Sequence, residues 1–87
     1  MAESLDLQLR DLYIRALRLH RRAETLPPDG LLAALSIDSV SMLEISIGVE
    51  AKYGIEIDPD DLSANLLDSF EVLARYITDK QAASTIG

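Results

Sequence analysis

Hydrophobic and polar residues follow two different periods along this chain. Between residues 4 and 24 the apolar positions recur at alternating spacings of four and three, which is the period of an amphipathic helix. These positions are Leu5, Leu9, Leu12, Ala16, Leu19 and Ala23. Asp6 and Asp11 each precede an arginine by four residues, an order that favours ion pairs along a helix. We therefore predict a first helix over residues 4–24, which the adjacent Pro27 and Pro28 cannot extend.

The pattern over residues 39–53 allows two interpretations. Apolar residues occupy nearly every second position and β-branched side chains are frequent, which is typical of a strand. However, this segment is long for a strand and ordinary for a helix. Asp38 or Ser39 can cap the start of such a helix, and Gly54 stands where a left-handed residue would end it. A helical stripe also fits, formed by Met42, Ile45, Val49 and Tyr53. We predict a helix here.

The remaining pattern predicts shorter elements and a last helix. Residues 31–35 are expected to form a loop or one helical turn that packs into the core, and residues 62–66 a short helix. Asp68 precedes Glu71 by three residues, which resembles a capping box at the start of the last helix. The inner face of that helix is expected to carry Phe70, Leu73, Ala74 and Ile77.

We expect an all-α fold, a small bundle of three main helices plus one short helix. The last helix is expected to end near Lys80, so residues 1–80 would form a single domain and residues 81–87 a disordered tail. The composition agrees with packed helices, since 48% of the residues are hydrophobic and only 5% are aromatic.

The absence of cysteine excludes disulfides, thiolate metal sites and a cysteine nucleophile. No apolar run approaches the roughly 20 residues that span a membrane, and the first residues do not resemble a secretory signal. We expect a cytoplasmic monomer. His20 is the only histidine, and no metal-ligand spacing or glycine-rich phosphate loop is present. We therefore expect a protein that is not an enzyme and that has no metal site.

The net charge of −7 is unevenly distributed. Residues 1–24 hold five of the eight basic residues against four acids, whereas residues 38–61 hold seven acids against Lys52 alone. Such acidity disfavours nucleic acids and anionic membranes as partners. It suits proteins with basic patches, although acids also simply keep a small domain soluble.

Three segments together resemble the acyl carrier proteins. The box Leu35-Ser36-Ile37-Asp38-Ser39-Val40 is similar to the Leu-Gly-x-Asp-Ser-Leu box that opens the family's second helix. Tyr53-Gly54-Ile55-Glu56-Ile57 matches the aromatic-Gly-Ile-x-Ile end of that helix. Residues 68–77 resemble the family's final helix. The resemblance covers roughly residues 3–80, and it favours the helical interpretation of residues 39–53.

The resemblance implies a carrier function. A phosphopantetheinyl transferase would move 4′-phosphopantetheine from coenzyme A to the oxygen of Ser39, and the arm would hold acyl groups as thioesters for other enzymes. Asp38 would order the turn, or contact the transferase or its metal. Loading and synthase enzymes with basic docking patches are the further partners that it implies. The residues expected to face partners or to line the acyl pocket are Val40, Met42, Glu44, Ile45, Glu50 and Glu56.

The chain departs from the family pattern at several positions. Ser36 replaces the usual glycine of the box, Val40 replaces leucine, and acids are missing at Ser41, Ala51 and Lys52. We expect these changes to indicate a carrier of polyketide or other specialised biosynthesis. We also hypothesise that two small residues, Ser46 and Gly48, alter the acyl pocket. Two alternatives stay open: an aminoacyl carrier of nonribosomal peptide synthesis, and an unmodified acidic module that binds a basic protein.

Overall fold

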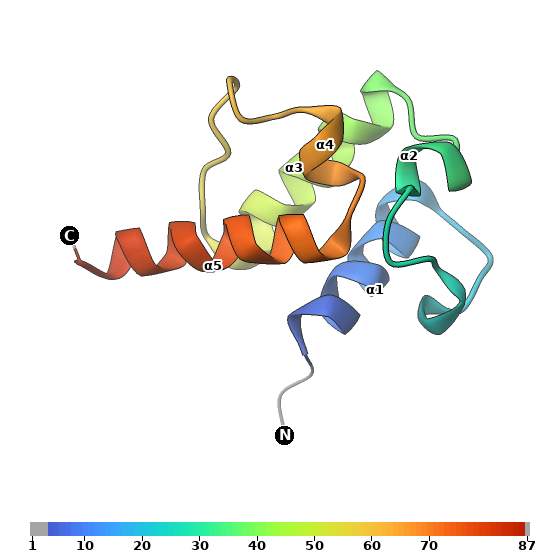
Figure 1. Cartoon of the computed structure of the whole chain (residues 1–87), viewed down its shortest axis with the longest axis horizontal. Coiled ribbons are helices and arrows are strands. Elements are labelled where there is room, and N and C mark those ends of the chain that lie inside the picture. The colour runs from blue at the N-terminus through green and yellow to red at the C-terminus, as the bar shows by residue number, and fades with distance from the viewer. Residues whose placement is uncertain (1–3, 87) are drawn as a thin grey trace.

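The computed structural model describes residues 4–86, and every regular element in that range is a helix. The three long helices are α1 (Leu5–Leu17), α3 (Ser39–Tyr53) and α5 (Phe70–Ile86). Two single-turn helices, α2 (Leu31–Ala34) and α4 (Ala64–Leu67), and a 3-10 turn, η1 (Ala23–Thr25), lie in the connections. Figure 1 shows α1 crossing the bundle below α2, with α5 extending away from it towards the C-terminus. The predicted all-α bundle is confirmed.

Local signals set the starts of the helices. Ser4 caps α1 by accepting a hydrogen bond from the backbone N–H of Leu7 at 3.2 Å. The two predicted ion pairs of this helix form, Asp6 with Arg10 at 2.8 Å and Asp11 with Arg15 at 3.1 Å.

Between residues 4 and 86 no helix is both long and apolar enough to cross a membrane.

Helix α1 is shorter than predicted. It ends at Leu17 because Arg18 adopts the left-handed conformation, with φ of 54°. The N–H groups of Arg18 and Leu19 then bond the carbonyls of Arg15 and Ile14, which is the Schellman pattern of a helix end. Leu19 still packs against the core. It therefore fits the apolar pattern because it is buried in the segment after the turn, although it is not part of α1.

Helix α5 differs from the prediction at both ends. Its first turn is capped by Ser69, whose hydroxyl accepts from the N–H of Val72, and Asp68 is used elsewhere. The helix continues to Ile86, six residues beyond the expected end at Lys80. The segment between contains no glycine or proline, so nothing stops the helix. Of the predicted tail, Gly87 lies outside the described residues.

The core lies where α1 packs against α3 and α5. Ile45 and Val49 of the predicted stripe on α3 are fully buried. Tyr13 is also fully buried, and its hydroxyl donates a 2.7 Å hydrogen bond to the carbonyl of Leu67. The ring of Tyr13 meets that of Phe70 edge to face, with centroids 4.9 Å apart. This contact joins α1 to the corner between α4 and α5.

Candidate attachment site at the start of helix α3

The site is built by the turn that connects α2 to α3. Ser36 adopts a left-handed conformation with φ of 53°, and the N–H of Ile37 bonds the carbonyl of Leu32 at 2.9 Å. The side chain of Ile37 is buried, whereas Asp38 and Ser39 are exposed. The turn therefore holds one side chain in the core and presents the next two to solvent.

The turn is also anchored to Asp68, which lies two residues before α5. The carbonyl and the side chain of Asp68 accept hydrogen bonds from the N–H groups of Leu31 and Leu32, at 3.1 and 2.9 Å. These two N–H groups belong to the first turn of α2, which would otherwise leave them unpaired. Asp68 thus fixes α2, and with it the loop before the site, to the start of α5.

Asp38 is the residue that caps α3. Its carboxylate accepts a 2.8 Å hydrogen bond from the N–H of Ser41. Hydrogen bonds from the backbone N–H and side chain of Ser41 lower the pKa of the Asp38 carboxyl below its usual range, so this group is ionised at neutral pH. Asp38 therefore orders the helix start, which is one of the roles expected for it.

Ser39 has no comparable structural role. It is the first residue of α3, it is exposed, and within residues 4–86 its hydroxyl makes no hydrogen bond. Because Asp38 already provides the cap, the hydroxyl of Ser39 is not needed for the helix start. It stands at the positive end of a 15-residue helix, where backbone N–H groups favour an attached phosphate.

The residues expected to face partners divide into two groups. Val40, Glu44 and Glu56 are exposed, with Val40 at 65%. Ile45 is fully buried, and Met42 is half-buried against the core, so these two point inward. The half-buried Glu50 accepts a 2.8 Å hydrogen bond from the N–H of Ile57, which holds the loop after α3.

Two exposed apolar residues of α3 lie outside the predicted partner-facing set. Leu43 and Ile47 are 54% and 56% exposed, and they continue the face that begins at Val40 at helical spacings of three and four. A helical projection with Ile45 and Val49 on the inner side would have found them. The alternating pattern arises because apolar residues occupy this outer face as well as the inner one.

The two small residues of α3 lie in different surroundings. The hydroxyl of the buried Ser46 donates to the carbonyl of Leu43 at 2.8 Å, inside its own helix. Gly48 lines a groove between α1 and α3.

Across the part of the chain that the structure describes, no three histidine, aspartate or glutamate side chains gather as metal ligands.

Comparison with known families gives an independent assignment. Residues 8–77 match the model of the phosphopantetheine attachment site. The meromycolate extension acyl carrier protein of Mycolicibacterium aurum is 42% identical over 41 residues, which are 47% of this chain and 42% of that protein. The acyl carrier protein of Thermobifida fusca is 42% identical over 40 residues, 46% of this chain and 51% of that protein. These matches thus span about half or less of either relative. No solved structure matches the chain.

Proposed function

The chain belongs to the acyl carrier protein family, whose members contain the phosphopantetheine attachment site, and on that premise we propose that Ser39 is the residue that receives the arm. The observation that carries this proposal is the free, exposed hydroxyl of Ser39 beside a cap that Asp38 supplies alone. The bound arm supplies a terminal thiol, which holds acyl groups as thioesters.

The attachment step needs one nucleophilic oxygen and one leaving group. The oxygen of Ser39 attacks the phosphorus of coenzyme A that is bonded to pantetheine, and adenosine 3′,5′-bisphosphate leaves. The hydroxyl proton passes to a base of the transferase. The exposure of Ser39 allows a transferase to reach the oxygen, and the N–H groups of the first turn of α3 stabilise the phosphodiester that forms.

The exposed side chains of α3 support a role in partner binding. Val40, Leu43 and Ile47 form an apolar surface, and Glu44 adds a carboxylate beside it. Apolar contacts provide the area of an interface, and charge selects among partners. We infer that this surface, with the exposed Glu56, meets the transferase and the loading and synthase enzymes through their basic patches.

We also infer that the cargo is an acyl group of a specialised pathway, such as polyketide synthesis. Support for an acyl cargo comes from the sequence Ile37-Asp38-Ser39, since peptidyl carriers favour Gly-Gly-x-Ser. Support for a specialised pathway comes from Ser41 and Lys52, which reduce the acidity of α3.

The mass of the protein after incubation with coenzyme A and a broad-specificity transferase tests the attachment. We expect each wild-type chain to gain one phosphopantetheinyl group and Ser39→Ala to gain none. Ser36→Gly is a matched control, since it changes a neighbouring serine and leaves Ser39 in place. If the folded wild-type protein gains no mass, or if Ser39→Ala is still modified, the assignment of Ser39 is wrong. The first result would favour an unmodified binding module.

A further inference from the structure

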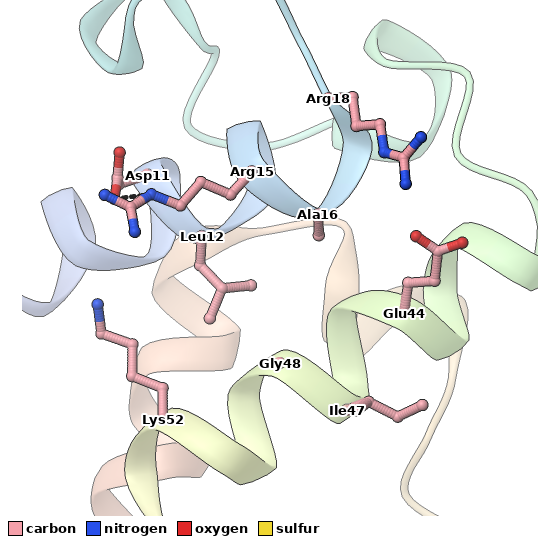
Figure 2. A pocket seen from close by; sticks show the side chains of 9 residues that line it. All are labelled: Asp11, Leu12, Arg15, Ala16, Arg18, Glu44, Ile47, Gly48 and Lys52. Carbon is pink, nitrogen blue, oxygen red and sulfur yellow. Dashed lines mark ion pairs between the residues drawn. The ribbon is translucent and has the colours of Figure 1, made fainter.

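A groove of about 460 Å³ lies on the surface between α1 and α3 (Figure 2). Leu12 and Ala16 of α1 face Gly48 of α3 across it, and Arg18 and Lys52 stand towards its two ends. The groove therefore has an apolar floor and a basic side chain towards each end, with the carboxylate of Glu44 opposite Arg18. Two of its residues, Gly48 and Arg18, are unusual for the local structure in which they lie.

Gly48 is not required by the backbone or by packing. It lies in the middle of α3, where glycine destabilises a helix relative to alanine. A Cβ at this position would lie 3.5 Å from the nearest side-chain carbon of Leu12, which is an ordinary contact. Alanine would therefore fit and would strengthen the helix. What glycine provides is space on the floor of the groove.

Arg18 is the opposite case, since a long side chain stands where the backbone favours a small residue. Its left-handed position ends α1, and glycine or asparagine is the usual residue at such a position. The backbone of Arg18 is therefore held in a conformation that is unfavourable for a residue with a side chain. Figure 2 shows that this side chain reaches the rim of the groove, opposite Glu44. Gly48, whose missing side chain leaves space, and Arg18, whose side chain adds a charge, therefore lie at the same groove.

The charges of the groove are only partly neutralised. Arg15 pairs with Asp11 at 3.1 Å. Neither Arg18 nor Lys52 makes an ion pair with any residue between 4 and 86, and Glu44 makes none either. The lining thus holds three basic and two acidic side chains on a protein whose net charge is −7. The ammonium of Lys52 lies 5.9 Å from the ring centre of Tyr53 and makes no ion pair with the described residues. An apolar floor that ends at such a cation suits a chain of methylene groups that ends in a carboxylate.

We propose that this groove binds the acyl group of the chain's own arm when that group ends in a carboxylate, with Lys52 as the partner of the carboxylate. The proposal rests on the attachment at Ser39. Helical rise places Glu44 about 7 Å and Lys52 about 20 Å from Ser39 along α3. A phosphopantetheine arm has ~13 bonds between phosphorus and sulfur and extends about 15 Å. This length allows the thioester to pass around α3 and to reach the end of the groove at Glu44. The remaining length to Lys52 fits a chain of about six to eight carbons.

Amide chemical shifts of the loaded protein test this proposal. The arm is attached to ¹⁵N-labelled protein and acylated with suberoyl, an eight-carbon group that ends in a carboxylate, or with octanoyl, its neutral counterpart. We expect suberoyl to shift the amides of Leu12, Gly48 and Lys52 relative to the unloaded arm, and octanoyl to leave Lys52 unshifted. Lys52→Gln is expected to lower the occupancy of the groove by suberoyl by up to about fivefold, the effect of one exposed ion pair.

Three variants make the result specific. Gly48→Leu fills the groove and is expected to abolish the suberoyl shifts, with circular dichroism as the check on folding. Ala51→Leu adds the same side chain at an exposed position of α3 outside the groove, and Arg75→Gln removes a charge from α5. Both controls are expected to keep the wild-type shifts.

The outcomes separate this inference from the proposed function. If no arm can be attached to Ser39, both fail. If the arm attaches but suberoyl leaves the groove amides unshifted, only the groove inference fails. The same holds if suberoyl shifts them equally in the wild-type protein and in Lys52→Gln. An effect of Gly48→Leu without an effect of Lys52→Gln would show a groove for apolar chains and would overturn the role of the carboxylate.

Discussion

Arg18 and Ser36 are the two described residues other than glycine that have a positive φ, and each ends a helix. Neither has the side chain that such a turn favours. At Ser36 the left-handed conformation sends Ile37 into the core and leaves Asp38 and Ser39 exposed. The backbone of a single residue thus sets the direction in which the proposed attachment site faces.

Ser36→Gly is expected to raise the free energy of unfolding by about 0.5–1 kcal/mol. A side chain in the left-handed region costs about 1–2 kcal/mol, which glycine avoids. The greater conformational freedom of glycine in the unfolded chain offsets part of this stabilisation. Urea unfolding at neutral pH measures the difference. The matched control is Ala33→Gly in the neighbouring turn of α2, which is expected to lower stability by about 0.5–1 kcal/mol. A Ser36→Gly protein less stable than the wild type would show that the serine side chain stabilises the turn.

Helix α3 illustrates how one element can satisfy two sequence patterns. Its inner face carries Ile45 and Val49, and its outer face carries Val40, Leu43 and Ile47. With apolar residues on both faces, the sequence approaches the alternation of a strand. The cap at the start of the helix and the left-handed Gly54 at its end, with φ of 64°, are the local features that favoured a helix. The predicted range of residues 39–53 is confirmed.

The end of α1 has no such local signal, because no glycine or proline stands at the turn that ends it. The guanidinium of Arg10, which lies 5.0 Å from the ring centre of Phe70, donates hydrogen bonds to the carbonyls of Ala23 and Leu26. These bonds hold the segment after the turn at Arg18 against α1. These hydrogen bonds join residues that are 13 and 16 positions apart. They stabilise the turn at Arg18 over a continuous helix, although the apolar pattern continues to Ala23.

Gly48→Ala is expected to stabilise α3 by about 0.5–1 kcal/mol, since it removes the entropic cost of a glycine inside a helix. The new Cβ would make only an ordinary contact with Leu12. Thermal unfolding followed by circular dichroism measures the gain. Gly54→Ala is the control, because its φ of 64° makes any side chain unfavourable there, and it is expected to lower stability by about 1 kcal/mol. A loss of stability in Gly48→Ala would mean that packing requires the glycine.

The whole molecule is held together by contacts of α1 with both other long helices. Tyr13 makes the most specific of these, since its hydroxyl and ring contact residues 54 and 57 positions further along the chain. Burial raises the pKa of the Tyr13 hydroxyl well above its usual range, with a smaller contribution from the charge of Asp68. The neutral phenol is thus part of the folded core.

Tyr13→Phe is expected to lower the free energy of unfolding by about 1–2 kcal/mol, because the carbonyl of Leu67 loses its buried donor. The raised pKa also predicts a dependence on pH. Stability from a neutral Tyr13 is complete below the pKa of about 10 of the unfolded tyrosine, and it is lost as the pH rises beyond that value. The difference in stability between wild type and variant is therefore expected to narrow above pH 10.

Urea unfolding at pH 7 and above pH 10 measures both effects. Tyr53→Phe is the control, since Tyr53 is only half-buried and its hydroxyl bonds the side chain of Gln8 at 3.1 Å. We expect a smaller loss in this variant. A loss in Tyr13→Phe no greater than that in Tyr53→Phe would contradict the importance of the bond to Leu67.

Features that depend on neighbours in the chain could be predicted from the residues alone. They include the range of α3, the exposed Asp38 and Ser39, and the ion pairs of α1. Caps, turn residues and helical spacing all act within a few positions, so the sequence contains both partners of each interaction.

Other features required the packed molecule. The burial of Tyr13, the turn at Arg18 and the groove at Gly48 each involve elements far apart in the chain. A pattern of apolar residues indicates that a face is buried, but it does not say which neighbour covers it or where a gap remains. Those outcomes depend on how three helices of given volume and shape pack against one another.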